Sequence, residues 1–195
     1  PLVSLPEVAE RWDEPSALPK MSIGALAAHL TRAVTTVEQY LDSPVRHGDE
    51  EPLTAAGYYA SFKDTNDVDA PGNVGVRDRA ATLAASGHQT LTDTLEHAIN
   101  HLRVRLADEP EDRLVEVFGG FVLPLDEYLV TRIVELTLHS DDLCVSLGKP
   151  TPSLPGTEMT IRTLVDVGTI RHGETAVLHA LARRERDTED ALRVL

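Results

Sequence analysis

Residues 128–147 read Y-L-V-T-R-I-V-E-L-T-L-H-S-D-D-L-C-V-S-L, with apolar side chains on nearly every side of a helix. We therefore expect a helix here that is buried over much of its length. Glu135 and His139 are four residues apart, so their side chains lie on one face of this helix. A buried carboxylate and imidazole need a counter-ion, a shifted pKa or a metal ion, because burying an unpaired charge costs much free energy.

The composition indicates one globular domain. The chain has 195 residues, of which 42% are hydrophobic and 26% charged, and we expect a single domain over residues 1–195. Because the sequence begins with Pro1 rather than Met, we expect a short N-terminal piece to be missing. No apolar run has the length of a membrane span and no signal-peptide pattern is present.

The charge and the motifs exclude several classes of partner. Thirty-two acidic residues against 18 Lys and Arg give a net charge of -14, and no cluster of basic residues interrupts this balance. Nucleic acids and anionic membranes bind clustered cations, so we expect neither as a partner and expect a small-molecule ligand instead. A dinucleotide-binding loop, a P-loop and a Gly-x-Ser-x-Gly elbow are also missing from the sequence.

The chain has a single cysteine, Cys144. It allows no internal disulfide and no cysteine-rich zinc site, which fits a reducing cytoplasm. It follows His139 by five residues and therefore points away from the face that carries Glu135. We interpret Cys144 as a small core side chain rather than as a nucleophile.

Three more long helices are predicted from apolar stripes at helical spacing. Ser22 is a suitable N-cap for a helix over residues 23–41. Asn73 precedes a second pattern, which predicts one long helix over residues 75–106. A third pattern predicts one long helix over residues 157–184.

The remaining segments connect these helices. Residues 114–124 alternate on both sides of a Gly-Gly pair, which predicts a β-hairpin. Residues 42–73 are rich in Pro, Gly and acids, and we expect a solvated crossover with a short helix near 53–62. Residues 185–195 are expected to fray. The pattern predicts an all-α four-helix bundle with a short β-hairpin before the third bundle helix.

His29 is a possible third member of the Glu135 and His139 site. It lies beside the apolar stripe of residues 23–41, and spacing alone favours a histidine at the edge of the core that bonds a backbone carbonyl. If it faced the other two, the set would be two imidazoles and one carboxylate from two helices. Such a set suits zinc with an open position, and it also suits Fe(II), Ni or Mn.

A rival pair is His97 and His101, which have the four-residue spacing of two metal ligands on one helix face. They flank the apolar stripe of residues 75–106 rather than lying within it. We therefore interpret them as a half-exposed pair without a metal.

Two stretches resemble a known family. Residues 12–30, W-D-E-P-S-A-L-P-K-M-S-I-G-A-L-A-A-H-L, are similar to the P-S-x-L-P…G-x-L-x-x-H-L element of the mycothiol-dependent maleylpyruvate isomerase family, and residues 125–148 resemble its R-x-x-E-x-x-x-H-x-x-D-L element. This family belongs to the DinB/YfiT-like superfamily of metal-binding four-helix bundles. The resemblance implies that His29, Glu135 and His139 are zinc ligands and that mycothiol is the thiol cosubstrate.

Two further residues near the predicted ligands are candidates for a role. Arg132, three residues before Glu135, either pairs with that carboxylate or anchors a substrate carboxylate. Asp142, three residues after His139, either orients that imidazole, contacts the thiol cosubstrate or bonds within its own helix.

The resemblance implies a zinc-dependent S-transferase or isomerase that uses a low-molecular-weight thiol and acts on a small electrophile. The named isomerase carries a further C-terminal domain, for which we expect no room after Leu195, so we retain the broader class rather than maleylpyruvate itself. An alternative is a non-catalytic metal-binding or ligand-binding bundle that interacts with a protein partner. A metal-dependent hydrolase ranks last, because no separate general base is evident.

Overall fold

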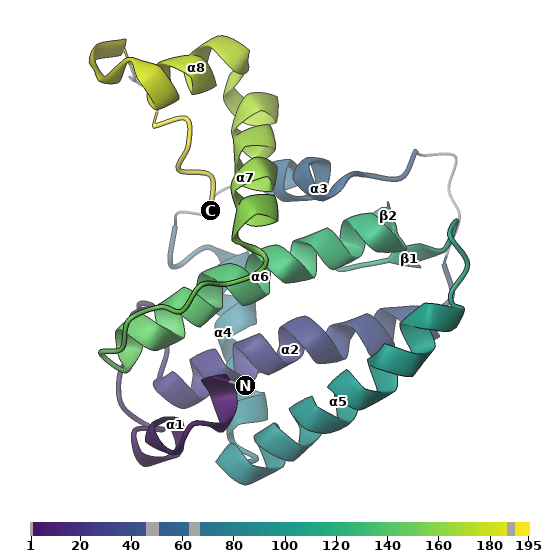
Figure 1. Cartoon of the computed structure of the whole chain (residues 1–195), viewed down its shortest axis with the longest axis vertical. Helices are drawn as coiled ribbons and strands as arrows, with labels where there is room; N and C mark the ends of the chain where they lie inside the picture. Colours follow the sequence, from purple (N-terminus) through teal and green to yellow (C-terminus); the bar gives the residue numbers. More distant parts are fainter. Residues whose placement is uncertain (1, 46–50, 63–66, 187–189) are drawn as a thin grey trace.

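The computed structural model describes residues 2–45, 51–62, 67–186 and 190–195 (Figure 1). The elements are, in chain order, η1 (Leu2–Ser4), α1 (Pro6–Glu10), α2 (Ile23–Asp42), α3 (Ala55–Ser61), α4 (Pro71–Ala84), α5 (His88–Asp108), β1 (Leu114–Glu116), β2 (Val122–Pro124), α6 (Leu125–Ser146), α7 (Thr157–His172), α8 (Glu174–Ala182) and η2 (Arg184–Arg186), where η denotes a 3-10 helix. The predicted all-α fold with a hairpin before α6 is confirmed.

Helix α2 is the central element of the fold. It packs against α4, α5 and α6 (Figure 1). It begins where predicted, because the side chain of Ser22 accepts a hydrogen bond from the backbone N–H of Ala25 at 3.1 Å. Near this end the Trp12 ring lies so close to Gly24 that a Cβ there would come within 2.4 Å of the indole. A helix in contact with three others buries most of its surface, and this holds α2 in a defined position.

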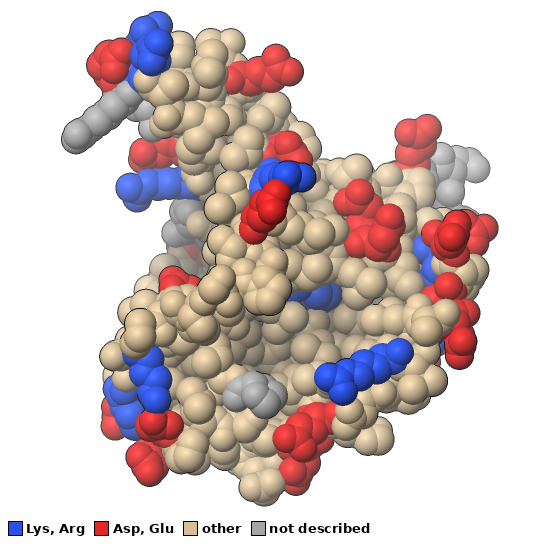
Figure 2. Space-filling model, in the orientation of Figure 1, with Lys and Arg blue, Asp and Glu red and all other residues tan. Residues whose placement is uncertain are grey.

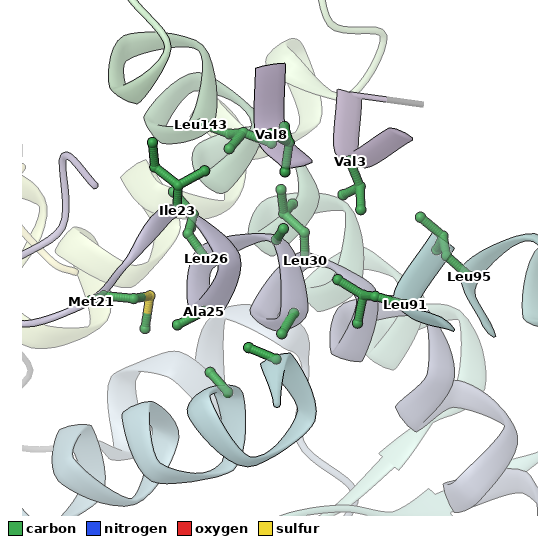
Figure 3. Close-up of a cluster of buried hydrophobic side chains, with 14 residues drawn as sticks. Val3, Val8, Met21, Ile23, Ala25, Leu26, Leu30, Leu91, Leu95 and Leu143 are labelled. Atoms are coloured by element: carbon green, nitrogen blue, oxygen red, sulfur yellow. The ribbon is translucent and has the colours of Figure 1, made fainter. Parts of the chain in front are cut away.

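A cluster of apolar side chains packs around the first half of α2 (Figure 3). Leu26 has no exposed surface, and burying a leucine of this kind contributes about 2 kcal/mol. The side chains labelled in the figure are Val3, Val8, Met21, Ile23, Ala25, Leu26, Leu30, Leu91, Leu95 and Leu143. They come from five elements and one loop, so this cluster joins the N-terminal segment to α2, α5 and α6.

Helices α2 and α6 run antiparallel where they touch. The hydroxyl of Tyr128 donates a hydrogen bond of 3.0 Å to Oγ1 of Thr36. In the next contact, His29 lies beside Glu135. His29 precedes Thr36 by seven residues on α2, and Glu135 follows Tyr128 by seven residues on α6. From one contact to the other, the residue numbers fall along α2 and rise along α6, so the two helices are antiparallel. The two contacts also fix which residues of α2 face which residues of α6.

The predicted hairpin is present and leads directly into α6. Strands β1 and β2 pair antiparallel, with Val115 opposite Leu123, and both of these side chains are buried. Gly119 and Gly120 form the turn at φ values of +89° and +76°, which side chains disfavour. Because α6 starts one residue after β2, the hairpin sets where the helix begins.

Two helices that we predicted as continuous are each broken, so that part of the prediction was wrong. The helix expected over 75–106 is divided into α4 and α5 at Gly87, and the helix expected over 157–184 is divided into α7 and α8 at Gly173. These glycines have φ values of +84° and +85°, which end a right-handed helix. The apolar stripe continues across each glycine, and periodicity alone therefore did not reveal the breaks.

The expectation that residues 185–195 fray was wrong for residues 190–195. Ala191 and Val194 are 0% and 2% exposed, and the chain returns along α7 after α8 (Figure 1). Nη1 of Arg171 donates a hydrogen bond of 2.6 Å to the carbonyl oxygen of Val194. Ala191 and Val194 are two of the four apolar residues in this tail, and their burial docks it, which a reading of its charge alone overlooked.

Acidic and basic side chains are scattered over the face in Figure 2, without a concentrated basic patch on that face. Within the described ranges, no helix combines the length and the hydrophobicity needed to cross a membrane.

Replacing Gly168 by Ala tests the docking of the tail. The new Cβ would lie 2.5 Å from the carbonyl oxygen of Ala191, so the tail must shift, and we expect the free energy of unfolding to fall by about 1–3 kcal/mol. Gly72→Ala is the control, because it adds a Cβ in a helix with nothing within 4 Å, and it should be neutral or stabilising. Chemical denaturation of both variants gives the comparison, and equal stabilities would contradict the docked tail.

Candidate metal centre

Three side chains meet between α2 and α6. Nε2 of His29 lies 3.2 Å from Oε2 of Glu135, and Nε2 of His139 lies 3.5 Å from the same oxygen. One ligand atom of each residue lies within 4.8 Å of the other two. The structure thus brings together the three residues that the sequence singled out. Metal binding by them stays a prediction.

The positions follow from the antiparallel packing of the two helices. Glu135 and His139 project from one face of α6 because they are one turn apart, and α2 presents His29 across from them. The side chains of His29, Glu135 and His139 are 17%, 20% and 21% exposed. This partial exposure leaves the cluster accessible to small molecules while removing much of the water around it.

Asp142 orients His139. Its Oδ2 lies 2.8 Å from Nδ1 of the imidazole, which donates a hydrogen bond to the carboxylate. With the Nδ1 proton held there, Nε2 is directed toward Glu135 and supplies a lone pair when the ring is neutral. Of the roles predicted for Asp142, the geometry agrees with the orientation of His139.

Tyr59 on α3 is a member of the site that the sequence analysis missed. Its hydroxyl is a donor that lies 3.0 Å from Oε1 of Glu135 and 2.9 Å from the carbonyl oxygen of Thr131. We had expected residues 42–73 to be a solvated crossover, yet the short helix predicted within them carries this tyrosine to the centre of the molecule. A spacing pattern cannot link residues so far apart in the chain.

One predicted role of Arg132 was an ion pair with Glu135, and the structure does not show this pair. Within the part of the chain that the structure describes, no carboxylate lies within ion-pair distance of its guanidinium. Instead its Nε donates a hydrogen bond of 3.0 Å to Oγ1 of Thr131, and the guanidinium carbon lies 4.9 Å from the centre of the Tyr128 ring. The other alternative, that Arg132 anchors a substrate carboxylate, stays a prediction.

The contacts of the cluster favour the ionised form of the Glu135 carboxylate. Burial alone would raise the pKa of Glu135, but hydrogen bonds with His139 and His29 outweigh burial and hold that pKa well below its ordinary value. Burial would likewise lower the pKa of His139, yet its contacts with Asp142 and Glu135 raise that pKa to about 9. Without a metal, His139 is therefore an imidazolium at neutral pH, and metal binding must displace its Nε2 proton.

The other sequence candidates do not join this cluster. His97 and His101 are exposed on α5, with ring centres 6.3 Å apart, and Nδ1 of His101 contacts Glu38. Cys144 is 1% exposed, which confirms a core position, and burial raises the pKa of its thiol. Among the described residues, the cluster of His29, Glu135 and His139 is the one group of three or more His, Cys, Asp or Glu side chains arranged to hold one ion.

Two surface hollows lie elsewhere. One of about 660 Å3 is lined by residues near the end of α2 and the start of β1, and one of about 770 Å3 lies between α3, α6 and α7. Neither lining includes the three clustered side chains, so the donor geometry rather than cavity size identifies the site.

The sequence profile of the family described as "Mycothiol maleylpyruvate isomerase N-terminal domain" matches residues 2–144. The chain belongs to this family. The matched region contains His29, Glu135 and His139, whereas α7 and α8 lie beyond it. None of the curated proteins compared with the sequence is significantly similar to it.

A solved structure supports the fold of this mycothiol maleylpyruvate isomerase N-terminal domain. The chain is similar to the crystal structure of a histidine-to-alanine mutant of the mycothiol-dependent maleylpyruvate isomerase, with a TM-score of 0.50 and 18% identity. The similarity covers 84% of this chain and 62% of that one. At this identity the likeness shows the fold alone, and the chain spans less than two thirds of that protein's length.

The pKa of His139 in the metal-free protein tests the geometry of the cluster. Because the folded pKa of about 9 exceeds the ordinary 6.5, protonation stabilises the metal-free fold fully below pH 6.5, and this contribution is lost as the pH rises through 9. We expect an NMR titration to place the His139 pKa near 9, and Asp142→Asn to lower it below about 8 by removing the carboxylate charge.

Asp141→Asn is the control for that titration, because it changes the neighbouring carboxylate, which bonds Thr151 and not the imidazole. This variant should leave the His139 pKa near that of the wild type. A His139 pKa near 6.5 in the wild type, or equal effects of the two variants, would contradict the described geometry.

Proposed function

We propose that this family member is a zinc-dependent enzyme in which a low-molecular-weight thiol of the mycothiol type attacks a small electrophile, in an S-transfer or an isomerisation. The observation that carries the proposal is the meeting of Nε2 of His29, Nε2 of His139 and Oε2 of Glu135 at a partly exposed position. Family membership supports the thiol, since the family is described by its mycothiol-linked isomerase.

The donor set fits zinc. Two imidazoles and one carboxylate are the protein ligands of several catalytic zinc sites, which keep a further position for water or substrate. Asp142 behind His139 is the kind of carboxylate partner that orients zinc-binding imidazoles. Zinc held by these residues would supply a Lewis acid that lowers the pKa of a thiol toward neutrality.

The chain's own residues prepare this site. Asp142 keeps the Nδ1 proton on His139, so the proton released on metal binding is the one at Nε2. The hydroxyl of Tyr59 points at Oε1 of Glu135, which leaves Oε2 to face both imidazoles. Partial burial strengthens the electrostatic interactions within the cluster. These contacts hold the donors in position before any ligand arrives, which reduces the cost of ordering them.

We also propose that residues 1–195 form a single domain with one metal centre. Helix α7 supports this, because it packs against α3 and α6 and not as a separate unit. A cytoplasmic location is part of the proposal, and the buried, free thiol of Cys144 is compatible with a reducing compartment.

Metal content tests the ligand set. We expect the purified wild type, incubated with zinc and freed of excess, to retain about one ion per chain, and His29→Ala and Glu135→Ala to retain far less, because each removes one of three ligands. His97→Ala is the matched control and should retain as much as the wild type, since this histidine is exposed on α5. Elemental analysis together with circular dichroism separates loss of metal from loss of fold.

Two results of that experiment would overturn the ligand assignment. One is stoichiometric zinc in both His29→Ala and Glu135→Ala. The other is loss of zinc in His97→Ala with retention in the other two, which would move the site to α5.

Thiol binding tests the chemistry. Zinc-loaded wild type should bind mycothiol and release about one proton per thiol bound at pH 7, because a metal-activated thiol binds as its thiolate. S-methylated mycothiol is the matched ligand, and we expect its affinity to be at least about tenfold lower, since it has no ionisable sulfur. Calorimetry in two buffers of different ionisation enthalpy gives the affinity and the proton release. Equal affinity for both ligands would contradict a role of the thiol.

A further inference from the structure

Arg32 and Arg132 occupy facing positions on the antiparallel pair of α2 and α6. Arg32 lies three residues after His29, and Arg132 lies three residues before Glu135, which is the residue across from His29. The next contact along the pair joins Thr36 to Tyr128. The two arginines thus lie between two observed contacts, on the helix faces that meet there, about one helical turn from the metal centre.

Both guanidinium groups lie apart from the carboxylates of the described residues. Within the described part of the chain, no Asp or Glu lies within ion-pair distance of Arg32 or Arg132. Other arginines do find acids, as Arg105 does with Asp42 at 2.7 Å and Arg113 with Glu109 at 3.5 Å. The chain has 32 acidic and 18 basic residues, so two facing arginines with no ion pair to an acid of the described ranges are unlike their surroundings.

Like charges that face each other repel, and partial burial increases the repulsion because water screens them less. Both side chains are only partly exposed. The pKa of Arg32 is lowered by burial and by the positive charges of Arg79 and Arg132. Burial alone would lower the pKa of Arg132 as well, but its interactions with Tyr128 and Glu135 outweigh burial and raise that pKa. Glu135 thus offsets the repulsion at Arg132, whereas the pKa of Arg32 stays lowered, and arginine does not lose its proton in proteins.

The neighbouring side chains hold these arginines ready for a ligand. The guanidinium of Arg132 lies against the Tyr128 ring and is bonded to Thr131 through Nε. The Nη atoms of Arg132, which form the outer edge of its fork, are in no protein hydrogen bond within the described residues. Arg79 of α4 lies over the Phe118 ring at 5.4 Å and adds positive charge at the edge of the same region.

We propose that Arg32 and Arg132 form an anion site that binds a carboxylate of the electrophilic substrate. The assignment of this carboxylate to the electrophile rests on the function proposed above. The anion site itself does not depend on that function. Guanidinium groups bind carboxylates through paired N–H···O hydrogen bonds, which are stronger than neutral ones. A carboxylate held one turn from the metal centre places a carbon a few bonds away beside the cluster of His29, Glu135 and His139. The substrate class is therefore a small electrophile with a carboxylate a few bonds from the reacting carbon.

Succinate is a suitable probe because it has two carboxylates and does not react with thiols. Calorimetry on zinc-loaded and metal-free protein should show succinate binding in both forms, and binding should weaken about tenfold or more in Arg32→Met and Arg132→Met. Arg32→Lys keeps the charge and should retain part of the affinity. Arg103→Met is the matched control, because it removes an exposed arginine of α5, and it should bind succinate like the wild type. Succinamide, which is uncharged, should not bind.

Two further readouts separate this site from a purely structural role. Arg32→Met should keep one zinc per chain, and its melting temperature without ligand should not fall, because the substitution removes a repulsion. If Arg132→Met fails to fold, Arg32→Met and Arg32→Lys decide the question.

The proposal is overturned if both Met variants bind succinate like the wild type, or if succinate binds only when zinc is present and independently of the arginines. Binding of inorganic phosphate without binding of succinate would overturn the carboxylate assignment. Loss of zinc from the wild type with succinate binding intact would instead contradict the proposed function and leave the anion site standing.

Discussion

A carboxylate that is mostly buried between two helices has to be neutralised, and Glu135 meets this requirement through residues of both helices. His139 on its own helix and His29 on α2 approach the same carboxylate oxygen. The contact therefore ties α2 to α6 at a defined register, and the hydrogen bond between Tyr128 and Thr36 keeps the same register further along. Everything proposed for this protein depends on that register, since a shift of either helix by one residue would separate the three donors.

The outer parts of the molecule support the same carboxylate. Arg171 on α7 donates hydrogen bonds of 2.7 Å and 2.8 Å to the carbonyl oxygens of Tyr59 and Phe62, and so holds the end of α3. Tyr59 in turn contacts Oε1 of Glu135. Helix α7 lies outside the region matched by the family profile, yet through α3 it helps to position a residue of the centre. Positioning of donors by such outer contacts is typical of metal sites.

Local signals in the sequence predicted much of the fold. The cap at Ser22 and the glycine pair at the hairpin turn act over a few residues, and both elements formed where expected. The breaks at Gly87 and Gly173 escaped prediction because a glycine within an apolar stripe is compatible with a helix until its φ is known. The spacing of Glu135 and His139 singled out two of the clustered donors, and the family resemblance added His29. Tyr59 and Arg32 were not singled out, because their placement beside residues distant in the chain is not encoded in periodicity.

The central claim is that one ion is shared by α2 and α6. Anomalous diffraction at the zinc absorption edge, from crystals of the zinc-loaded protein, locates the ion without assumptions about its ligands. The account predicts one strong peak within about 2.0–2.2 Å of Nε2 of His29, Nε2 of His139 and a carboxylate oxygen of Glu135. A peak bound by His97 or His101 on α5, or one that contacts only Glu135 and His139 while His29 remains apart, would contradict it.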